Sequence, residues 1–209
     1  MKKITITQIS EKKIKAGNPL LQMEDFPNEL SFDEGELVEL VDSRQKFVAK
    51  AYLAKQNKGV GWVFSLDNAD SFNEAFFKKQ FEKAKRKRTD LQSDPETTTY
   101  RLFNAEGDGI PGVTIDHYDG FAVVSWYSEG IFRYQTAIIA AFQAVFPETK
   151  GIYEKFRYQR KDGLISRYVR GDAAPTPLIV KENGINYATY LDDGLMTGIF
   201  LDQRDVRGA

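Results

Sequence analysis

Residues 150–170 combine cations with aromatic side chains in a pattern typical of RNA-binding surfaces. The stretch contains seven Lys and Arg residues against two acidic residues, a local charge of +5, and four aromatic residues lie among them. Base stacking and phosphate contact could therefore share one surface, which is how single-stranded RNA is usually held. An amphipathic hairpin with exposed arginines explains the same pattern equally well. The side chains that we predict to bind RNA are Lys155, Arg157, Arg160, Lys161 and Arg167.

A second cluster of chemically active residues lies near the end of the sequence and contains Asp192, Asp193, Asp202 and Asp205. Carboxylate oxygens are the ligands that Mg²⁺ and Ca²⁺ prefer, so one hypothesis is a metal-assisted hydrolase. An acidic turn, followed by a short helix that Asp202 caps, explains most of the aspartates without a metal. The hydrolase hypothesis predicts that Mg²⁺ or Mn²⁺ raises the thermal stability of the protein.

The segment Gly107–Gly112 matches the G-x-G-x-x-G spacing of dinucleotide-binding loops. Such a loop binds pyrophosphate where a strand leads into a helix. Here residues 113–118 alternate like a strand and Pro111 suits a turn, so we interpret the glycines as part of a hairpin loop. His117 is the single histidine, and without a second histidine or a cysteine beside it we assign it no role.

Composition excludes several classes of protein. The 209 residues include no cysteine, so disulfides, zinc fingers and cysteine nucleophiles are ruled out within the sequence. The net charge is −1, and binding to nucleic acid would therefore need a local basic face. Apolar runs are far shorter than the ~20 residues of a membrane-spanning helix, and the first residues alternate where a signal peptide would have an apolar block. We expect a soluble, unexported protein, with a cytoplasmic location and no membrane partner.

Short alternating segments dominate the first seventy residues. They predict strands at residues 3–9, 36–41, 46–53 and 60–66. Glycine-containing turns separate these segments, and closing the strands into a small barrel would leave no exposed sheet edge.

A basic helix follows this strand-rich part. Ser71 with Glu74 forms a capping-box pattern, and the helix is expected to reach about Leu91 before Pro95 ends it. Its cations could touch phosphate or could form an ordinary solvated face. They are Lys78, Lys79, Lys83, Lys85, Arg86, Lys87 and Arg88.

The pattern after Pro95 indicates a second layer of strands with one helix. Strands are expected at residues 97–105, 113–117 and 121–126, a helix at 133–146, and further strands at 151–156, 164–169 and 185–191. We summarise this order as strand, strand, helix, strand, strand, with the helix packed on one face of the sheet.

Two segments, Tyr100–Asp116 and Thr197–Arg204, resemble the S-adenosylmethionine-dependent cytosine-C5 methyltransferases of large-subunit ribosomal RNA. Members of that family have an N-terminal PUA domain, which is a small RNA-binding β barrel. A middle strand-strand-helix-strand-strand domain and a C-terminal Rossmann-like methyltransferase domain follow it. The first two domains would cover essentially this whole sequence. One departure concerns residues 17–21, where many members have a basic and an aromatic residue around the proline.

The resemblance implies a fold of the α+β class. An N-terminal PUA-like β barrel would be followed by a strand-strand-helix-strand-strand domain, with the Rossmann methyltransferase domain absent or truncated. The corresponding divisions are residues 1–72 for the PUA-like RNA-binding barrel, 73–96 for the basic helix and linker, 97–191 for the middle domain and 192–209 for the start of a missing methyltransferase domain.

The resemblance also implies an S-adenosylmethionine pocket in the full-length protein, bordered by Phe200, Gln203 and Arg204. The family's glycine-rich cofactor loop and catalytic cysteine belong to a region that would follow Ala209. Cytosine C5 becomes a good nucleophile only after a thiolate adds to C6, and a chain without cysteine supplies no thiolate.

We therefore expect the RNA-recognition portion of an rRNA methyltransferase, catalytically incomplete as given, with large-subunit ribosomal RNA as its partner. A stand-alone RNA-binding adaptor is the first alternative, and the metal-assisted hydrolase is less favoured. Formation of a homodimer through the middle domain is left open.

Overall fold

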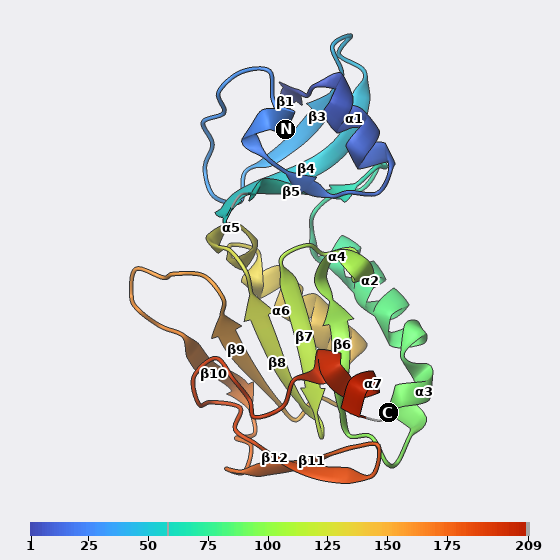
Figure 1. The fold of residues 1–209 in the computed structure, drawn as a ribbon, viewed down its shortest axis with the longest axis vertical. Coiled ribbons are helices and arrows are strands. Elements are labelled where there is room, and N and C mark those ends of the chain that lie inside the picture. The colour runs from blue at the N-terminus through green and yellow to red at the C-terminus, as the bar shows by residue number, and fades with distance from the viewer. Residues whose placement is uncertain (58, 208–209) are drawn as a thin grey trace.

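The computed structural model describes residues 1–57 and 59–207, except the side chain of Asp205. The chain forms two units that lie one above the other (Figure 1). No helix in the described part is long and apolar enough to cross a membrane.

The first unit is a five-stranded sheet in the order β1-β3-β4-β5-β2. Its strands are β1 (Lys2–Thr5), β2 (Leu20–Leu21), β3 (Leu37–Val41), β4 (Phe47–Gln56) and β5 (Gly59–Ser65). The pair β1–β3 is parallel and the other pairs are antiparallel. Side chains that alternate inward along β3 and β4, including Val38, Leu40 and Leu53, build the core of this unit.

Helix α1 (Gln8–Lys15) stands where the sequence predicts the second half of a strand. Strand β1 ends at Thr5 because Thr7 caps the helix, its Oγ1 accepting the Ser10 N–H at 3.2 Å. The 3-10 turn η1 (Met23–Asp25) follows β2 and bonds back through the Asp25 carbonyl, which accepts the Thr7 N–H. The prediction of a strand over residues 3–9 is therefore wrong after its third residue.

The second unit contains a five-stranded sheet in the order β10-β9-β8-β7-β6. Its strands are β6 (Thr99–Asn104), β7 (Val113–Tyr118), β8 (Phe121–Trp126), β9 (Gly151–Phe156) and β10 (Ser166–Gly171). Only β8 and β9 pair in parallel, and helices α5 (Glu129–Phe132) and α6 (Gln135–Val145) make the crossover that such a pair needs. The turn helix α4 (Ala105–Asp108) and the Gly107–Gly112 segment connect antiparallel β6 and β7, as the hairpin interpretation predicts.

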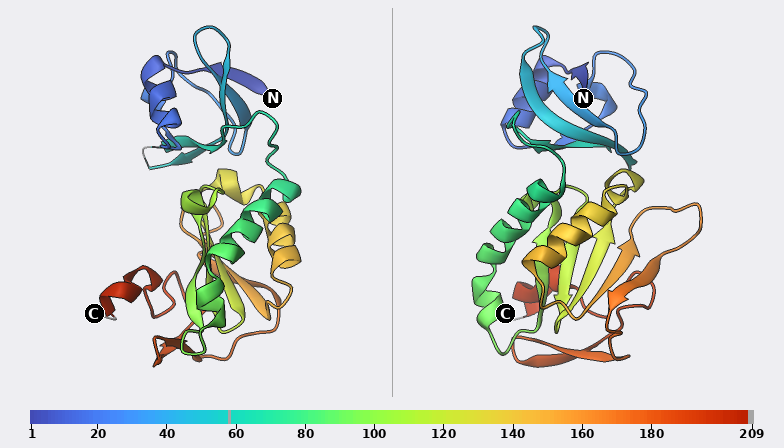
Figure 2. Two further views of the ribbon diagram at one scale, coloured as in Figure 1. Left: turned by 90° about the vertical axis from the view of Figure 1, so that its right-hand side faces the viewer. Right: turned by 180° about the vertical axis from the view of Figure 1, so that it is seen from behind.

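Two helices of the second unit pack side by side on one face of its sheet. Helix α2 (Glu74–Lys87) lies beside α6 on that face, and α3 (Thr89–Ser93) continues it (Figure 2). Asn73, not the predicted Ser71, caps α2, because its side chain accepts the Phe76 N–H at 3.1 Å. Phe81 of α2 meets rings of the sheet and of α6, so this basic helix is anchored by its apolar face.

The C-terminal part of the chain lies toward the opposite face of the sheet (Figure 2). It contains the hairpin β11 (Leu178–Glu182) and β12 (Ile185–Thr189), the 3-10 turn η2 (Leu201–Gln203) and helix α7 (Arg204–Arg207). Val180 and Ile199 pack with Tyr118 and Val123 in a separate apolar cluster. A strip of the sheet between this cluster and the first unit remains without a helical cover.

The predicted fold class, a β barrel followed by a strand-strand-helix-strand-strand domain, is wrong in its arrangement. The first unit includes helix α1, and three strands rather than two precede the crossover helix of the second unit. The strand predicted at residues 185–191 pairs with β11 in a two-stranded sheet of its own. Periodicity identified most strands individually, but pairing depends on contacts between distant residues.

The two units share one apolar core. Tyr52 of β4 is fully buried and its hydroxyl donates to the Pro111 carbonyl at 3.0 Å. Tyr134 donates to the Gly35 carbonyl at 2.6 Å from the other side of the junction. Gly130 of α5 lies against Ala54 of β4, where an added Cβ would overlap the Ala54 side chain. Close backbone approach therefore holds β4 against α5 and the β6–β7 loop.

The substitution Gly130→Ala is expected to lower the free energy of unfolding by about 1–3 kcal/mol, because the added methyl group has no room at the junction. Urea unfolding of the 209-residue chain measures the effect. Gly107→Ala in α4 is the matched control, since its Cβ would meet only the Asn104 amide, at 3.3 Å. Equal stability of the two variants would contradict the close packing of β4 on α5.

Candidate nucleic-acid interface

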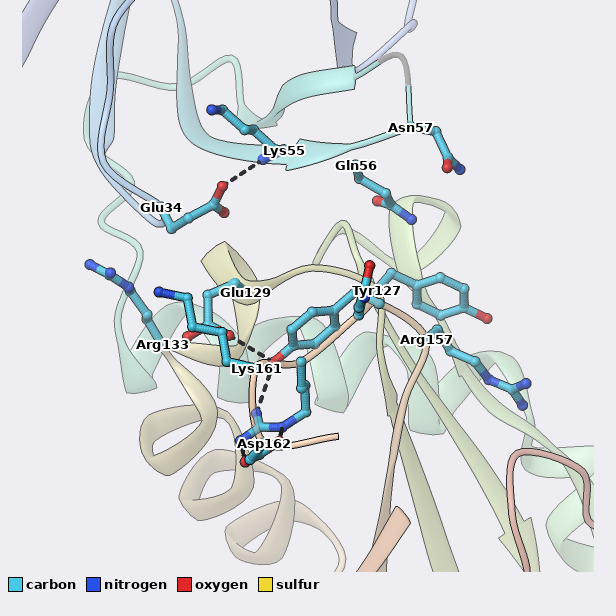
Figure 3. Close-up of a pocket in the computed structure, with 13 residues that line it drawn as sticks. Glu34, Lys55, Gln56, Asn57, Tyr127, Glu129, Arg133, Arg157, Lys161 and Asp162 are labelled. Carbon is cyan, nitrogen blue, oxygen red and sulfur yellow. Dashed lines mark hydrogen bonds and ion pairs between the residues drawn. The ribbon is translucent and has the colours of Figure 1, made fainter. Parts of the chain in front are cut away.

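A cleft of about 720 Å³ lies between the two units (Figure 3). The first unit contributes Glu34 and the end of β4 at residues 55–57. The second unit contributes the segment after β8, including Tyr127 and Glu129, and the loop after β9 at residues 157–162. The cleft depends on the junction because its walls come from both units.

The three carboxylates of the cleft are engaged by the protein itself. Glu34 Oε1 accepts the Lys55 N–H at 3.0 Å, while Glu34 Oε2 has no hydrogen-bond partner among the described residues, and Glu129 accepts a hydrogen bond from the Tyr158 hydroxyl at 3.0 Å. Asp162 binds the Arg160 guanidinium at 2.6 Å, and that hydrogen bond lowers the pKa of Asp162 to about 2. Arg160 also donates to the Tyr158 hydroxyl and lies 4.3 Å from the centroid of a phenylalanine ring. Through these contacts, Arg160 helps to fix the position of the Tyr158 side chain.

Four cations of the cleft, in contrast, are exposed: Lys55, Arg133, Arg157 and Lys161. Within residues 1–57 and 59–207, none of the four makes a salt bridge. Together with the half-buried rings of Tyr127 and Tyr158, they give the cleft free positive charge and aromatic surface. Phosphates and unstacked bases are the ligands that this combination suits.

A second cavity, of about 260 Å³, lies between the C-terminal segment and the face of the second sheet opposite α2 and α6, and it shares Tyr127 and Arg157 with the cleft. Its polar wall includes the ion pair of Arg101 and Asp116, in which Nε and Oδ1 are 2.6 Å apart. Burial raises the pKa of Asp116, although the Arg101 charge opposes this shift. The two cavities are neighbours along the sheet.

The structure divides the five predicted RNA-binding residues between different places. Arg157, Arg160 and Lys161 line the cleft. Lys155 is buried under the C-terminal segment, where its Nζ donates to the Gly194 carbonyl at 2.6 Å, and it lines the second cavity with Arg157. Arg167 points to the other face of the sheet and binds the buried Glu154 at 2.7 Å. The prediction that all five contact RNA stays untested, but the five do not share one surface.

The three residues predicted to border a cofactor pocket also lie apart. Phe200 is 52% exposed and lines the second cavity. Gln203 is exposed on η2. Arg204 instead donates to the Asn183 side chain at 2.7 Å and to Thr97 at 3.1 Å, which ties α7 to the rest of the unit.

Among the described side chains, the C-terminal aspartates form no metal site. Within the described part of the chain, no three His, Cys, Asp or Glu side chains are grouped closely enough to hold a metal ion. Asp202 lines the second cavity, and the side chain of Asp205 lies outside the described residues. The metal-assisted hydrolase therefore finds no support in the described geometry.

Several residues of the two cavities were missed in the sequence analysis. Lys55 and Arg133 come from distant elements, and only the packing of the two units brings them together. Arg101 and Asp116 had a detectable signal, since they stand on the two strands of the predicted hairpin and become directly opposed partners across it.

Comparisons with known proteins connect this geometry to a family. Residues 4–66 match the family described as PUA-like domain. The Bacillus subtilis protein named "Putative ribosomal RNA large subunit methyltransferase YwbD" is 41% identical over 100% of this chain and 54% of its own length. Ribosomal RNA large subunit methyltransferase I of Cronobacter sakazakii is 33% identical over 84% of this chain and 45% of its own length.

Two solved structures are also similar to this chain in sequence and in fold. "A putative sam-dependent methyltransferase from Streptococcus mutans" matches 99% of this chain and 53% of its own, with 44% identity and a TM-score of 0.92. A second structure, a putative methyltransferase complexed with SAH, has the same identity and TM-score and matches 99% of this chain and 52% of its own. The resemblance to large-subunit ribosomal RNA methyltransferases is thus confirmed, and the chain spans about half the length of the curated relatives it matches.

The structural match also requires a correction. We expected the methyltransferase domain to be absent or truncated, which would leave this chain with accessory folds only. The structures of two putative methyltransferases instead match 99% of this chain, so the chain shares their fold over that part. The expectation of an absent or truncated domain is withdrawn.

The environment of His117 gives a prediction for pH dependence. Its Nε2 accepts the Gly120 N–H at 3.2 Å, and burial lowers its pKa to about 4 from 6.5. The unfolded chain therefore binds more protons between pH 6.5 and 4, and the free energy of unfolding should fall as pH falls through this window. Because His117 is the single histidine, its ring signal in proton NMR should titrate near pH 4. A midpoint near 6.5 would contradict the burial.

Proposed function

We propose that this chain is the RNA-binding part of a large-subunit ribosomal RNA methyltransferase that uses S-adenosylmethionine. The names of the relatives support the reaction class, and the structure with SAH supports the cofactor. The PUA-like match over residues 4–66 supports an RNA substrate.

The observation that carries the proposal is the distribution of charge in the cleft. Each of its carboxylates accepts a hydrogen bond from the protein, although Glu34 Oε2 has no partner among the described residues, whereas four exposed cations make no salt bridge there. A phosphate backbone would neutralise these cations and release its counterions, which is the main source of affinity in nucleic-acid binding. The rings of Tyr127 and Tyr158 provide surfaces on which exposed bases stack.

The five predicted RNA-binding residues take different roles in this proposal. Arg157 and Lys161 contact phosphates directly. Arg160 positions the Tyr158 ring through its hydrogen bond and its own pairing with Asp162. Lys155 and Arg167 maintain the sheet from its two faces, Lys155 by holding the C-terminal segment and Arg167 by neutralising a buried glutamate.

The predicted cofactor contacts remain part of the proposal. Phe200, Gln203 and Arg204 would border the S-adenosylmethionine site, with Arg204 holding the segment in place through its bonds to Asn183 and Thr97. When bound, S-adenosylmethionine supplies the methyl group. For methylation at cytosine C5, the required thiolate is not among these 209 residues, which contain no cysteine.

The double substitution Arg157→Glu and Lys161→Glu is expected to weaken binding of single-stranded RNA. It should also reduce the slope of log affinity against log salt concentration by about 1 for each phosphate that the variant no longer neutralises. Fluorescence anisotropy with a labelled oligonucleotide at several salt concentrations measures both effects.

Arg170→Glu is the matched control for this experiment. Arg170 is an exposed arginine of the same basic stretch, but it binds Gln143 on the helix-covered face of the sheet. RNA binding by the control should equal that of the unchanged chain. If the double variant binds RNA with unchanged affinity and salt slope, the cleft is not the RNA-binding surface.

A further inference from the structure

The second cavity adjoins the cleft at Tyr127 and Arg157, and backbone hydrogen bonds fix the positions of both residues. The Tyr127 N–H donates to the Gly112 carbonyl at 3.0 Å, and the Arg157 N–H donates to the Trp126 carbonyl at 2.7 Å. Both side chains line the cleft and the second cavity alike. In Figure 3 they lie together at one end of the cleft, away from Arg133 and Lys161. An RNA strand bound in the cleft would therefore reach the second cavity at Tyr127 and Arg157.

The second cavity has an apolar part and a polar part. Val123, Met196 and Phe200 line the apolar part. The polar part contains the Ser125 hydroxyl and the Asp116 carboxylate, whose side chain is 14% exposed. Arg101, Lys155, Arg157 and Asp202 line the same cavity, so its wall is mainly polar and offers charged hydrogen-bond donors beside the Asp116 acceptor.

The Asp116 carboxylate keeps acceptor capacity despite its ion pair. Arg101 donates to both oxygens, at 2.6 and 3.3 Å, and each carboxylate oxygen can accept a second hydrogen bond. Arg101 also orients the carboxylate and compensates its charge in a partly buried site. A neutral donor such as an exocyclic amino group can therefore bind there, whereas a carbonyl group facing Asp116 would be repelled.

We propose that the second cavity receives one unstacked nucleobase of bound RNA, and that Asp116 recognises the exocyclic amino group of that base. The proposal rests on the proposed function, because it takes RNA to lie in the cleft. Arg157 would hold the phosphate of the same nucleotide at the junction of the two cavities. Tyr127 would cover one face of the base. Removing a base from its stack in this way is unfavourable, and stacking and hydrogen bonds in the cavity must offset its cost.

An amino-bearing base could also come from S-adenosylmethionine, whose adenine has the same group. The continuity of the cavity with the cleft favours RNA, because the phosphate-binding Arg157 lies at the shared boundary. A small cofactor that fills the second cavity alone would not require a connection to the cleft. Titrating the protein with SAH, in parallel with the two RNAs, distinguishes a base of RNA from the adenine of the cofactor.

The test compares the binding of oligo(C) and oligo(U), each about 12 nucleotides long, to the 209-residue chain by fluorescence anisotropy. Cytosine carries an amino group where uracil carries a carbonyl. The unchanged chain should bind oligo(C) roughly fivefold or more tightly, the discrimination expected from one good base contact. Asp116→Asn should abolish most of this preference, because the amide presents a donor as well as an acceptor.

Asp119→Asn is the matched control, since Asp119 is a carboxylate of the β7–β8 turn outside the cavity and pairs with Lys150. It should keep the preference for oligo(C). Thermal unfolding of both variants checks that they are folded, and Ser125→Ala provides a second variant of the cavity wall whose affinity for oligo(C) should fall.

The outcomes distinguish the two proposals. Equal affinity of the unchanged chain for oligo(C) and oligo(U) would overturn the base pocket, while a loss of binding on substitution of Arg157 and Lys161 would still support the proposed function. Absence of any RNA binding would overturn both. If SAH binds the unchanged chain but not Asp116→Asn in isothermal titration calorimetry, and saturating SAH leaves the affinities for oligo(C) and oligo(U) unchanged, the cavity binds the cofactor and the RNA-base assignment is wrong.

Discussion

The packing of β4 against α5 and the β6–β7 loop is the constraint on which the functional geometry depends. Tyr52 is fully buried at this junction and bonds the Pro111 carbonyl, and Gly112 leaves the space that the Tyr52 hydroxyl occupies. The Gly112 carbonyl in turn accepts the Tyr127 N–H. The β6–β7 loop, which contacts Tyr52 at the junction of the two units, therefore also positions an aromatic residue of the cleft.

In the cleft, acidic side chains hold neighbouring side chains in place, whereas several basic side chains are exposed and can bind an anionic ligand. Asp162 and Glu129 fix Arg160 and Tyr158, which makes one wall of the cleft rigid. Arg157 and Lys161 are exposed beside that wall. A net charge of −1 for the whole sequence is thus compatible with a local basic surface, because binding depends on where unpaired cations lie.

Sequence patterns located most strands and the basic stretch, but not the faces on which side chains lie. Alternation places Lys155 of β9 and Arg157, the residue after β9, toward one face of the sheet, whereas Arg167 pairs across the ladder with Glu154, on the other face. Charge counting along a sequence cannot separate these positions. Helix α1 was missed because four residues of β1 lead almost directly into a threonine cap. Lys55 reaches the cleft only through tertiary packing, which periodicity does not report.

The central claim is that single-stranded RNA lies in the cleft between the two units. Photocrosslinking with RNA that contains 4-thiouridine, followed by mass spectrometry of the linked peptides, tests it most directly. The account predicts crosslinks at the cleft rings, Tyr127 and Tyr158, and their loss when an unlabelled oligonucleotide competes. Crosslinks confined to helix α2 or to the hairpin β11–β12, with none at these two tyrosines, would contradict it.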